Sequence, residues 1–373
     1  MISTLSIQGF KSIRQLDKLE LRPLNVLIGP NGAGKSNFIS FFRMLSELIE
    51  GRLQFWVHKQ GGADRIVWFG VKQSPQLSFK ICFGLNDYQV KLESTVEGEF
   101  VFNFEIFTHS STFEKALSHQ NSGHKESTTI GYLLSLKSKN TTSNKNKIID
   151  TCCNTLTGWK TFHFHDTGET AGMRRFGSLH DQTSLRPDGS NLAAYLWQLR
   201  EFHPDVYTMI RKTVTLATPF FDDFVLNPRQ LPTGEEQIQL LWRQKGSDYP
   251  FWPSQLSDGT LRFICLVTAL SQPNLTPSTT ILIDEPELGL HPYAITLLGA
   301  LLRKASKRMQ VIVATQSVHL IDEFSIDDLL IVEREEGNTE FRRHTAESFA
   351  TWLESYTVGD LWMKNLLGGR PRG

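Results

Sequence analysis

Residues 29–36 read GPNGAGKS and carry residue types that bind phosphate groups. They fit the pattern GxxxxGK[ST], with Gly29, Gly34, Lys35 and Ser36 at its fixed positions. In this pattern backbone amides surround phosphate oxygens, the lysine reaches the β- and γ-phosphates, and the serine hydroxyl can hold Mg²⁺. The alternative is a chance glycine turn. The apolar run before the motif and the helical spacing after it favour a phosphate loop that binds a nucleoside triphosphate.

The residues expected to contact this nucleotide extend through the loop into the following helix. They are Asn31, Gly32, Ala33, Gly34, Lys35, Ser36 and Asn37.

Two adjacent carboxylates follow the apolar run at residues 280–283. Asp284 would lie at the carboxyl end of a buried strand, beside the phosphate loop, and hold Mg²⁺ together with Ser36. Glu285 can act as a general base for the attacking water. A solvated acidic turn is the alternative, and the phosphate loop makes it the weaker one. For Glu287, both assistance at the metal and simple exposure stay open.

A second anion-binding turn is expected at residues 256–260, LSDGT, which open the apolar stretch Leu261–Leu270. A Ser-x-Gly turn at a helix N-terminus can bind an anion through Ser257 and Gly259. Taken alone, the motif is equally typical of an ordinary helix cap.

These groups need a scaffold that brings distant segments to one edge, and the apolar runs predict it. Helical patterns alternate with short apolar strands, which indicates a mostly parallel sheet with helical crossovers. The expected strands are Leu24–Ile28, Ile238–Arg243, Thr280–Ile283 and Val311–Ala314, and the expected helices are Ser36–Leu48, Asp188–Glu201, Ile210–Phe221, Leu261–Leu270 and Pro292–Ala305.

Between residues 67 and 107 the runs are short and alternating, which predicts antiparallel strands on the flank of this sheet. Residues 118–150 are polar and are expected to form a mobile segment. We expect three parts: 1–84 with the phosphate loop, 85–180 as a β-rich insertion, and 181–373 with a helical region and the remainder of the core. The fold class is therefore α/β, with a flanking antiparallel region and an inserted helical and loop segment.

The composition limits the class of protein. The 39 Lys+Arg balance the 39 Asp+Glu, so any contact with nucleic acid would need a local patch. The apolar runs are too short to span a bilayer, and the first residues lack the pattern of a secretion signal. Four cysteines without zinc-site spacing favour free thiols. We expect a cytoplasmic protein with no membrane contact.

The order of phosphate loop, LSDGT and DEP carboxylates resembles the ABC-type ATPases. The resemblance implies that Ser257 and Gly259 contact ATP held at Lys35 of a second copy, in a homodimer or higher oligomer. At the end of VIVATQS the family usually has a histidine that senses the γ-phosphate, and this chain has Gln316. Glutamine can hydrogen-bond but does not titrate. Gln316 is the expected third catalytic residue beside Lys35 and Glu285; His319 and the Q-loop candidate Gln60 have weaker support.

The N-terminus, LSIQGFKSIRQLDKLEL, resembles the RecF/SMC-like branch of these ATPases, whereas LSDGTLR, IDEPELGLHP and ATQSVHLIDEF resemble AAA_21-type, OLD-like proteins. The chain carries neither coiled-coil arms nor a TOPRIM nuclease domain. By analogy, a separate effector protein, TOPRIM-like in such systems, would act with this ATPase, as in bacterial defence against phage.

Four functions stay open at this point. The first is an ATP-driven switch that closes two copies around ATP and controls an effector. The second is a RecF-like clamp that binds DNA directly, through Arg174, Arg175 and residues Lys137–Lys147. The third is a scaffold that binds ATP without hydrolysis. The fourth is a transporter subunit, which no feature of the sequence favours.

Overall fold

The computed structural model describes residues 1–109, 117–120, 123–128, 130–131 and 154–369. The chain folds as a mixed α/β protein around two six-stranded sheets and two smaller ones. Most of the polar segment expected at 118–150, including its lysines Lys137, Lys139, Lys145 and Lys147, lies outside the described residues.

The core sheet has the order β18-β17-β3-β16-β15-β8, and all its neighbouring strands are parallel except the β17–β18 hairpin. Its strands are β3 (Leu24–Ile28), β8 (Trp159–Phe162), β15 (Thr280–Asp284), β16 (Gln310–Thr315), β17 (Leu329–Glu335) and β18 (Asn338–Arg342). The expected parallel sheet is confirmed. The segments that follow β3, β8, β15 and β16 lie at the carboxyl edge of this sheet.

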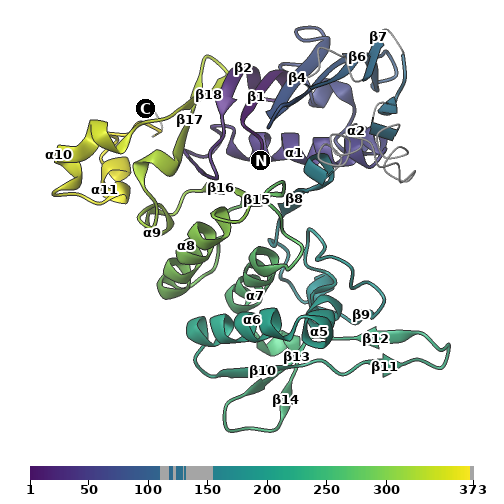
Figure 1. Ribbon diagram of the computed structural model, residues 1–373, viewed down its shortest axis with the longest axis vertical. Helices are drawn as coiled ribbons and strands as arrows, with labels where there is room; N and C mark the ends of the chain where they lie inside the picture. Colours follow the sequence, from purple (N-terminus) through teal and green to yellow (C-terminus); the bar gives the residue numbers. More distant parts are fainter. Residues whose placement is uncertain (110–116, 121–122, 129, 132–153, 370–373) are drawn as a thin grey trace.

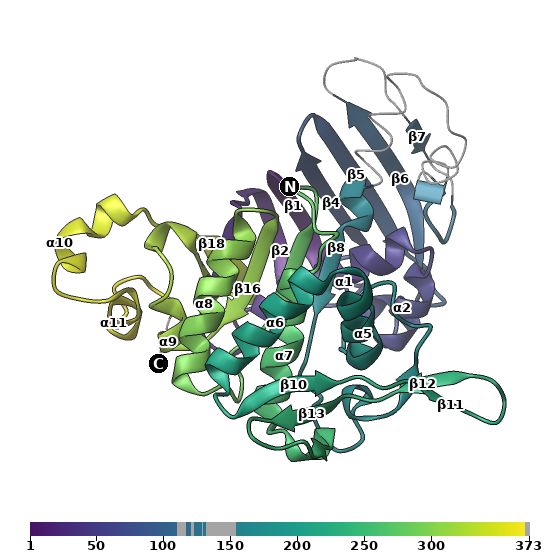
Figure 2. The same cartoon turned by 60° about the horizontal axis from the view of Figure 1, so that its bottom comes forward.

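Both faces of the core sheet are buried, which explains the unbroken apolar runs. Val26 and Ile28 belong to one hydrophobic cluster, with helices α7 (Asp258–Ser271) and α8 (Pro292–Ser306). Leu27 belongs to the other cluster, with helix α1 (Lys35–Ile49). Successive side chains of a strand point to opposite faces, so each short strand supplies both clusters. Figure 2 shows α8 and α7 in front of this sheet and α1 behind it.

A second, antiparallel sheet has the order β2-β1-β4-β5-β6-β7 and confirms the expected flanking region. Its strands are β1 (Thr4–Phe10), β2 (Ile13–Glu20), β4 (Gln76–Phe83), β5 (Asn86–Ser94), β6 (Phe100–His109) and β7 (Leu117–Gln120). Helix α2 (Leu53–Lys59) lies beside it, and the Glu126 carboxylate accepts hydrogen bonds from the first backbone amides of that helix, Leu53 N and Gln54 N, both at 2.9 Å.

Figure 1 shows this antiparallel sheet with α1 and α2 on one side of the molecule, and helices α5–α7 with the small sheets on the other. The elements on that second side are α5 (Leu192–Phe202), α6 (Pro204–Ala217), β9 (Gly177–Ser178), β10 (Phe221–Val225), β11 (Arg229–Gln230), β12 (Glu236–Ile238), β13 (Leu241–Gln244) and β14 (Pro250–Phe251). The remaining elements are α9 (Val318–Ile321), α10 (Ala350–Leu353), α11 (Val358–Met363) and the 3₁₀ turns Ala63–Arg65, Gly172–Arg174, Pro253–Gln255, Ile326–Asp328 and Ala346–Phe349.

Two expected elements in this region were placed wrongly. The helix expected at Ile210–Phe221 is α6, which begins at Pro204 and ends at Ala217. Proline fits the first turn of a helix because its missing N–H needs no partner there. The single strand expected at Ile238–Arg243 is two strands, β12 and β13, in different sheets.

The proposed three-part division stays a prediction. Residue 85 falls within the β4–β5 hairpin, and β8, inside the expected 85–180 segment, pairs with β15 of the core sheet. Within the described residues, no helix is both long and apolar enough to cross a membrane.

Candidate functional site

The phosphate loop connects β3 to α1 at the carboxyl edge of the core sheet, and its glycines are required by the backbone. Gly34 immediately precedes α1 with a φ of 116°, which side chains other than glycine rarely adopt. A Cβ on Gly34 would collide with the side chains of Thr339 and Ser12, and one on Gly29 would overlap the Val332 carbonyl. Positions 29 and 34 of the loop therefore require glycine.

Two hairpins support the loop from beneath. Thr339, on the β17–β18 hairpin, places its hydroxyl oxygen 2.8 Å from Ala33 O and 2.7 Å from Ser12 Oγ, which belongs to the β1–β2 hairpin. Asn37 of α1 donates to the same Ser12 Oγ at 2.7 Å. Of the residues expected at the nucleotide, Asn31, Gly32 and Ser36 are exposed, whereas Ala33 is buried and Asn37 is half-buried and contacts Ser12.

Lys35 lies in the loop with only 5% of its surface exposed. Its Nζ donates to Gly29 O at 2.7 Å and to Pro30 O at 3.0 Å. Burial lowers the pKa of Lys35, while the nearby carboxylates, first Glu285 and then Asp284, act in the opposite direction. The ammonium group is thus held beside these carboxylates, where a γ-phosphate would require it.

Asp284 ends β15 and faces the beginning of α1. The Ser36 hydroxyl forms a hydrogen bond with its carboxylate, and burial raises the pKa of Asp284. One carboxylate oxygen of Asp284, Oδ1, is buried and has no hydrogen-bond partner in the described part of the chain. A buried carboxylate oxygen without a partner beside a serine hydroxyl fits the oxygen ligands that Mg²⁺ prefers.

Glu285 adopts the left-handed conformation, with a φ of 46°, and its backbone amide donates to Ala314 O at 2.8 Å. Its side chain accepts a hydrogen bond from Gln316, whose Nε2 lies 3.0 Å from Glu285 Oε1. Strained backbone of this kind persists only where the surroundings enforce it. The fold therefore aims the expected base at the edge between β15 and β16.

Glu287 is not a solvent-exposed residue. Its Oε1 accepts hydrogen bonds from Thr315 Oγ1 at 2.6 Å and from Gln316 N at 3.2 Å, and burial raises its pKa. Glu287 therefore fixes the backbone at the end of β16, and Gln316 is held between two glutamates.

Sequence reasoning missed two basic groups near Asp284. Arg43 of α1 and His165, which follows β8, both lower the pKa of Asp284 through their charges. Parallel pairing places β8 beside β15, so residues after β8 were candidates for this edge. Within the described residues, no group of three His, Cys, Asp or Glu side chains could hold a metal ion by itself.

The LSDGT turn begins α7 as expected. Ser257 is exposed and caps the helix, its Oγ accepting from Thr260 N at 3.1 Å. A Cβ on Gly259 would overlap the Gly289 carbonyl, so the start of α7 packs against the loop after the carboxylates. Of the weaker candidates, His319 is exposed on α9, and Gln60 ends α2.

Arg174 is buried, and this removes it from the surface patch expected to contact DNA. Its guanidinium donates to Thr167 O at 2.7 Å, to Leu256 O at 3.2 Å, to Asp258 Oδ1 at 2.7 Å and to Pro253 O. Three of these acceptors, Pro253, Leu256 and Asp258, flank Ser257, so Arg174 holds the turn that presents it.

Arg262, one turn into α7, also fixes the position of this helix. Its Nε donates to Phe164 O at 2.8 Å, and its other nitrogens donate to His165 O and to Leu288 O. The LSDGT helix is thereby joined to both segments that border Asp284.

Fold and site together define a P-loop nucleotide-binding α/β protein, with the phosphate loop, the carboxylates and Gln316 at one edge of a parallel sheet. The sequence matches AAA_21, described as "AAA domain, putative AbiEii toxin, Type IV TA system", over residues 24–322. The chain belongs to this family.

Solved structures with the same fold are heads of SMC proteins. An SMC head bound to the C-terminal winged-helix domain of ScpA is similar with a TM-score of 0.60 and 13% identity, covering 94% of this chain and 99% of that one. An SMC head with an extended coiled coil, bound to the C-terminal domain of ScpA from Pyrococcus furiosus, gives 0.55 and 13%, covering 95% and 98%. Among curated proteins no significant match was found.

Proposed function

We propose that the chain is a Mg²⁺-dependent ATPase that acts as a switch in a toxin or defence system. One observation carries the proposal: Lys35, the Ser36–Asp284 pair and the Gln316–Glu285 pair meet at one edge of the core sheet. Each pair has the chemistry that one part of a phosphoryl-transfer site needs.

The residues divide the work by position. The amides of the loop and Lys35 bind the β- and γ-phosphates, and Ser36 with Asp284 holds Mg²⁺, which neutralises phosphate charge when bound. Glu285 accepts a proton from the attacking water, and Gln316 keeps its carboxylate oriented through the hydrogen bond at 3.0 Å.

The switch requires a second copy, because Ser257 lies on an exposed turn from which it can reach another chain's γ-phosphate. The proposed dimer joins Lys35 of one chain to Ser257 of the other around each ATP, and hydrolysis reopens it. The description of the family as a putative toxin supports control of a separate effector. DNA as the direct ligand has less support, since Arg174 is buried.

The test is the mass in solution, by light scattering, of Glu285→Gln with and without MgATP. Loss of the base is expected to trap an ATP-dependent dimer or larger species, and Lys35→Ala is expected to prevent it. Glu354→Gln, an exposed glutamate on the C-terminal segment, is the matched control and should hydrolyse ATP like the unchanged protein. The same mass for Glu285→Gln with and without ATP would contradict the switch.

A further inference from the structure

The order of the core strands sets the direction in which a bound nucleotide extends. Its γ-phosphate end faces Asp284 and Glu285, which follow β15. The phosphate loop follows β3, which has β16 and β15 on one side and β17 and β18 on the other. A nucleotide whose γ-phosphate faces β15 therefore extends its nucleoside toward the β17–β18 hairpin. This step rests on the proposed function.

An aromatic pair lies on that side. Phe69 is 63% exposed, although it is a large apolar residue, and it adopts the left-handed conformation with a φ of 51°. Its ring meets the Trp68 ring edge-on, with centroids 4.6 Å apart. Core packing does not explain an exposed phenylalanine in this backbone conformation, which costs free energy.

The neighbours of this pair are the hairpins that support the phosphate loop. Trp68 Nε1 donates to Gly337 O at 3.4 Å, and a Cβ on Gly337 would lie 2.9 Å from the Phe69 ring. The Arg14 guanidinium lies 5.1 Å from the centre of the Trp68 ring. Gly337 is two residues from Thr339, whose hydroxyl contacts Ala33 of the loop. The β17–β18 hairpin thus contacts Phe69 through Gly337 and the phosphate loop through Thr339.

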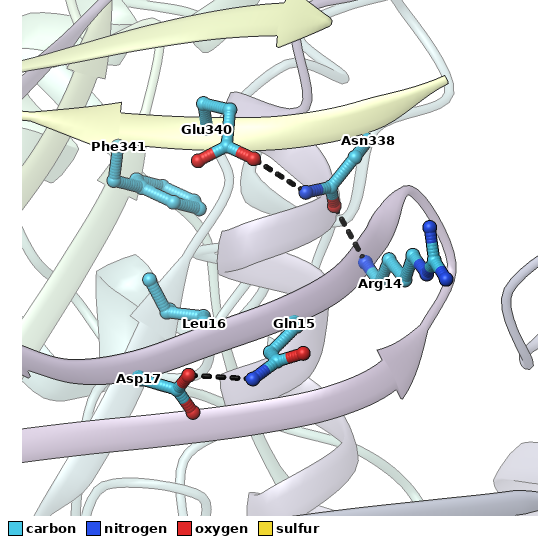
Figure 3. Close-up of a pocket in the computed structure, with 7 residues that line it drawn as sticks. All are labelled: Arg14, Gln15, Leu16, Asp17, Asn338, Glu340 and Phe341. Atoms are coloured by element: carbon cyan, nitrogen blue, oxygen red, sulfur yellow. Dashed lines mark hydrogen bonds between the residues drawn. The ribbon is translucent and has the colours of Figure 1, made fainter. Parts of the chain in front are cut away.

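Arg14, which contacts the Trp68 ring, also lines two surface grooves that do not include Phe69 or Trp68. Figure 3 shows a groove of about 570 Å³ between β2 and β18, with Arg14 extending from the hairpin tip and its backbone amide bonded to Asn338 Oδ1 at 2.7 Å. A second groove shares Arg14, Asn338 and Glu340. Asn338 also donates to Glu340 at 2.6 Å, so its amide is already engaged within the chain.

We propose that Phe69 is the base-stacking residue of the nucleotide site, with Trp68 and Arg14 holding its ring in place. Stacking is tolerant of base identity because every base has a π-face. Contact through stacking alone does not distinguish one purine from another. ATP and GTP should therefore bind with dissociation constants within about threefold of each other.

The test separates the base from the phosphates by titration calorimetry with MgATP and with magnesium tripolyphosphate. Phe69→Ala is expected to raise the dissociation constant of ATP about tenfold and to leave the dissociation constant of tripolyphosphate unchanged. Phe69→Trp should restore ATP affinity. Phe202→Ala, an exposed phenylalanine at the end of α5, is the matched control and should bind both ligands normally.

Three results would overturn the proposal. Phe69→Ala could weaken the binding of ATP and of tripolyphosphate equally, or it could leave ATP binding unchanged. The third is a more than tenfold tighter binding of ATP than of GTP by the unchanged protein. Failure of the proposed function looks different, because the unchanged protein would then bind neither ATP nor tripolyphosphate.

Discussion

Gln316 follows β16, and its hydrogen bonds show how an amide can hold a neighbouring carboxylate. Its side chain donates to Glu285, and its backbone amide donates to Glu287. An amide gives this hydrogen bond at every pH, whereas an imidazole changes charge near pH 6.5. In the proposed mechanism, the base Glu285 is thus held by a group that does not titrate.

Gln316→Ala should lower kcat by on the order of tenfold to a hundredfold, because the base loses its orienting hydrogen bond. Gln316→His should restore part of the rate near pH 8. Below about pH 6.5 the protonated imidazole would stabilise the Glu285 anion and make it a weaker base, so kcat should fall. Steady-state hydrolysis across pH checks both variants.

The control is the unchanged protein, which should lack the acid limb that Gln316→His introduces. A rate for Gln316→Ala equal to that of the unchanged protein would show that Gln316 does not orient the base.

At the residue scale, the sequence predicted which residue types could do chemistry, but it did not predict how these residues are arranged in space. The GxxxxGK[ST] pattern and the DEP carboxylates identify their own residues, since each type has a defined chemical use. Arg43 and His165 were missed, because their proximity to Asp284 depends on the placement of α1 and β8. Glu287 was ambiguous for the same reason, as its partners come from β16.

Among the elements, α7 depends on two buried arginines for its position. Arg174 donates to Pro253 O, in the 3₁₀ turn, to Leu256 O, which follows it, and to Asp258. Arg262 joins the helix to Leu288 and His165. A planar guanidinium can engage several acceptors at once, which an ammonium cannot.

Arg174→Met should leave ATP binding at Lys35 intact and abolish the ATP-dependent dimer, because the turn presenting Ser257 loses its support. The loss of stability should be about 1–3 kcal/mol, because the Thr167 and Leu256 carbonyls lose their donor while Asp258 stays exposed to water. Arg174→Lys should recover only part of the dimer. ATP titration, thermal unfolding and light scattering measure these three effects.

Mixing Arg174→Met with Lys35→Ala adds a sharper test. A mixed dimer contains one complete site, formed by Lys35 of the first chain and the LSDGT turn of the second. Partial recovery of ATP-dependent dimer in the mixture is expected. No recovery, with both proteins folded, would mean that Arg174 acts elsewhere than on the turn.

The sequence predicted most elements by type, and its errors are physical. Strands β3, β15 and β16 are buried on both faces and therefore read as unbroken apolar runs. The start of α6 was placed too late because Pro204 at its first position was not used as a signal. Arg174 was assigned to a surface patch because composition alone does not show burial.

At the scale of the whole molecule, closure of two copies should protect specific backbone. In Glu285→Gln with MgATP, amide hydrogen exchange should slow in residues 253–260 and 286–291, where Gly259 packs against Gly289. Strands β4–β6 should keep their exchange rates. The same protection pattern in Lys35→Ala, or protection confined to the phosphate loop, would argue against a second copy.

The support of the phosphate loop also bears on biosynthesis. Thr339 contacts Ala33, which lies 306 residues earlier in the chain. The Val332 carbonyl packs against Gly29. At a translation rate of roughly 5–20 residues per second, Thr339 is synthesised on the order of tens of seconds after the phosphate loop. A nascent chain that stops before residue 339 therefore lacks a supported loop. The protein's capacity to hold nucleotide is in this way tied to synthesis having passed residue 339.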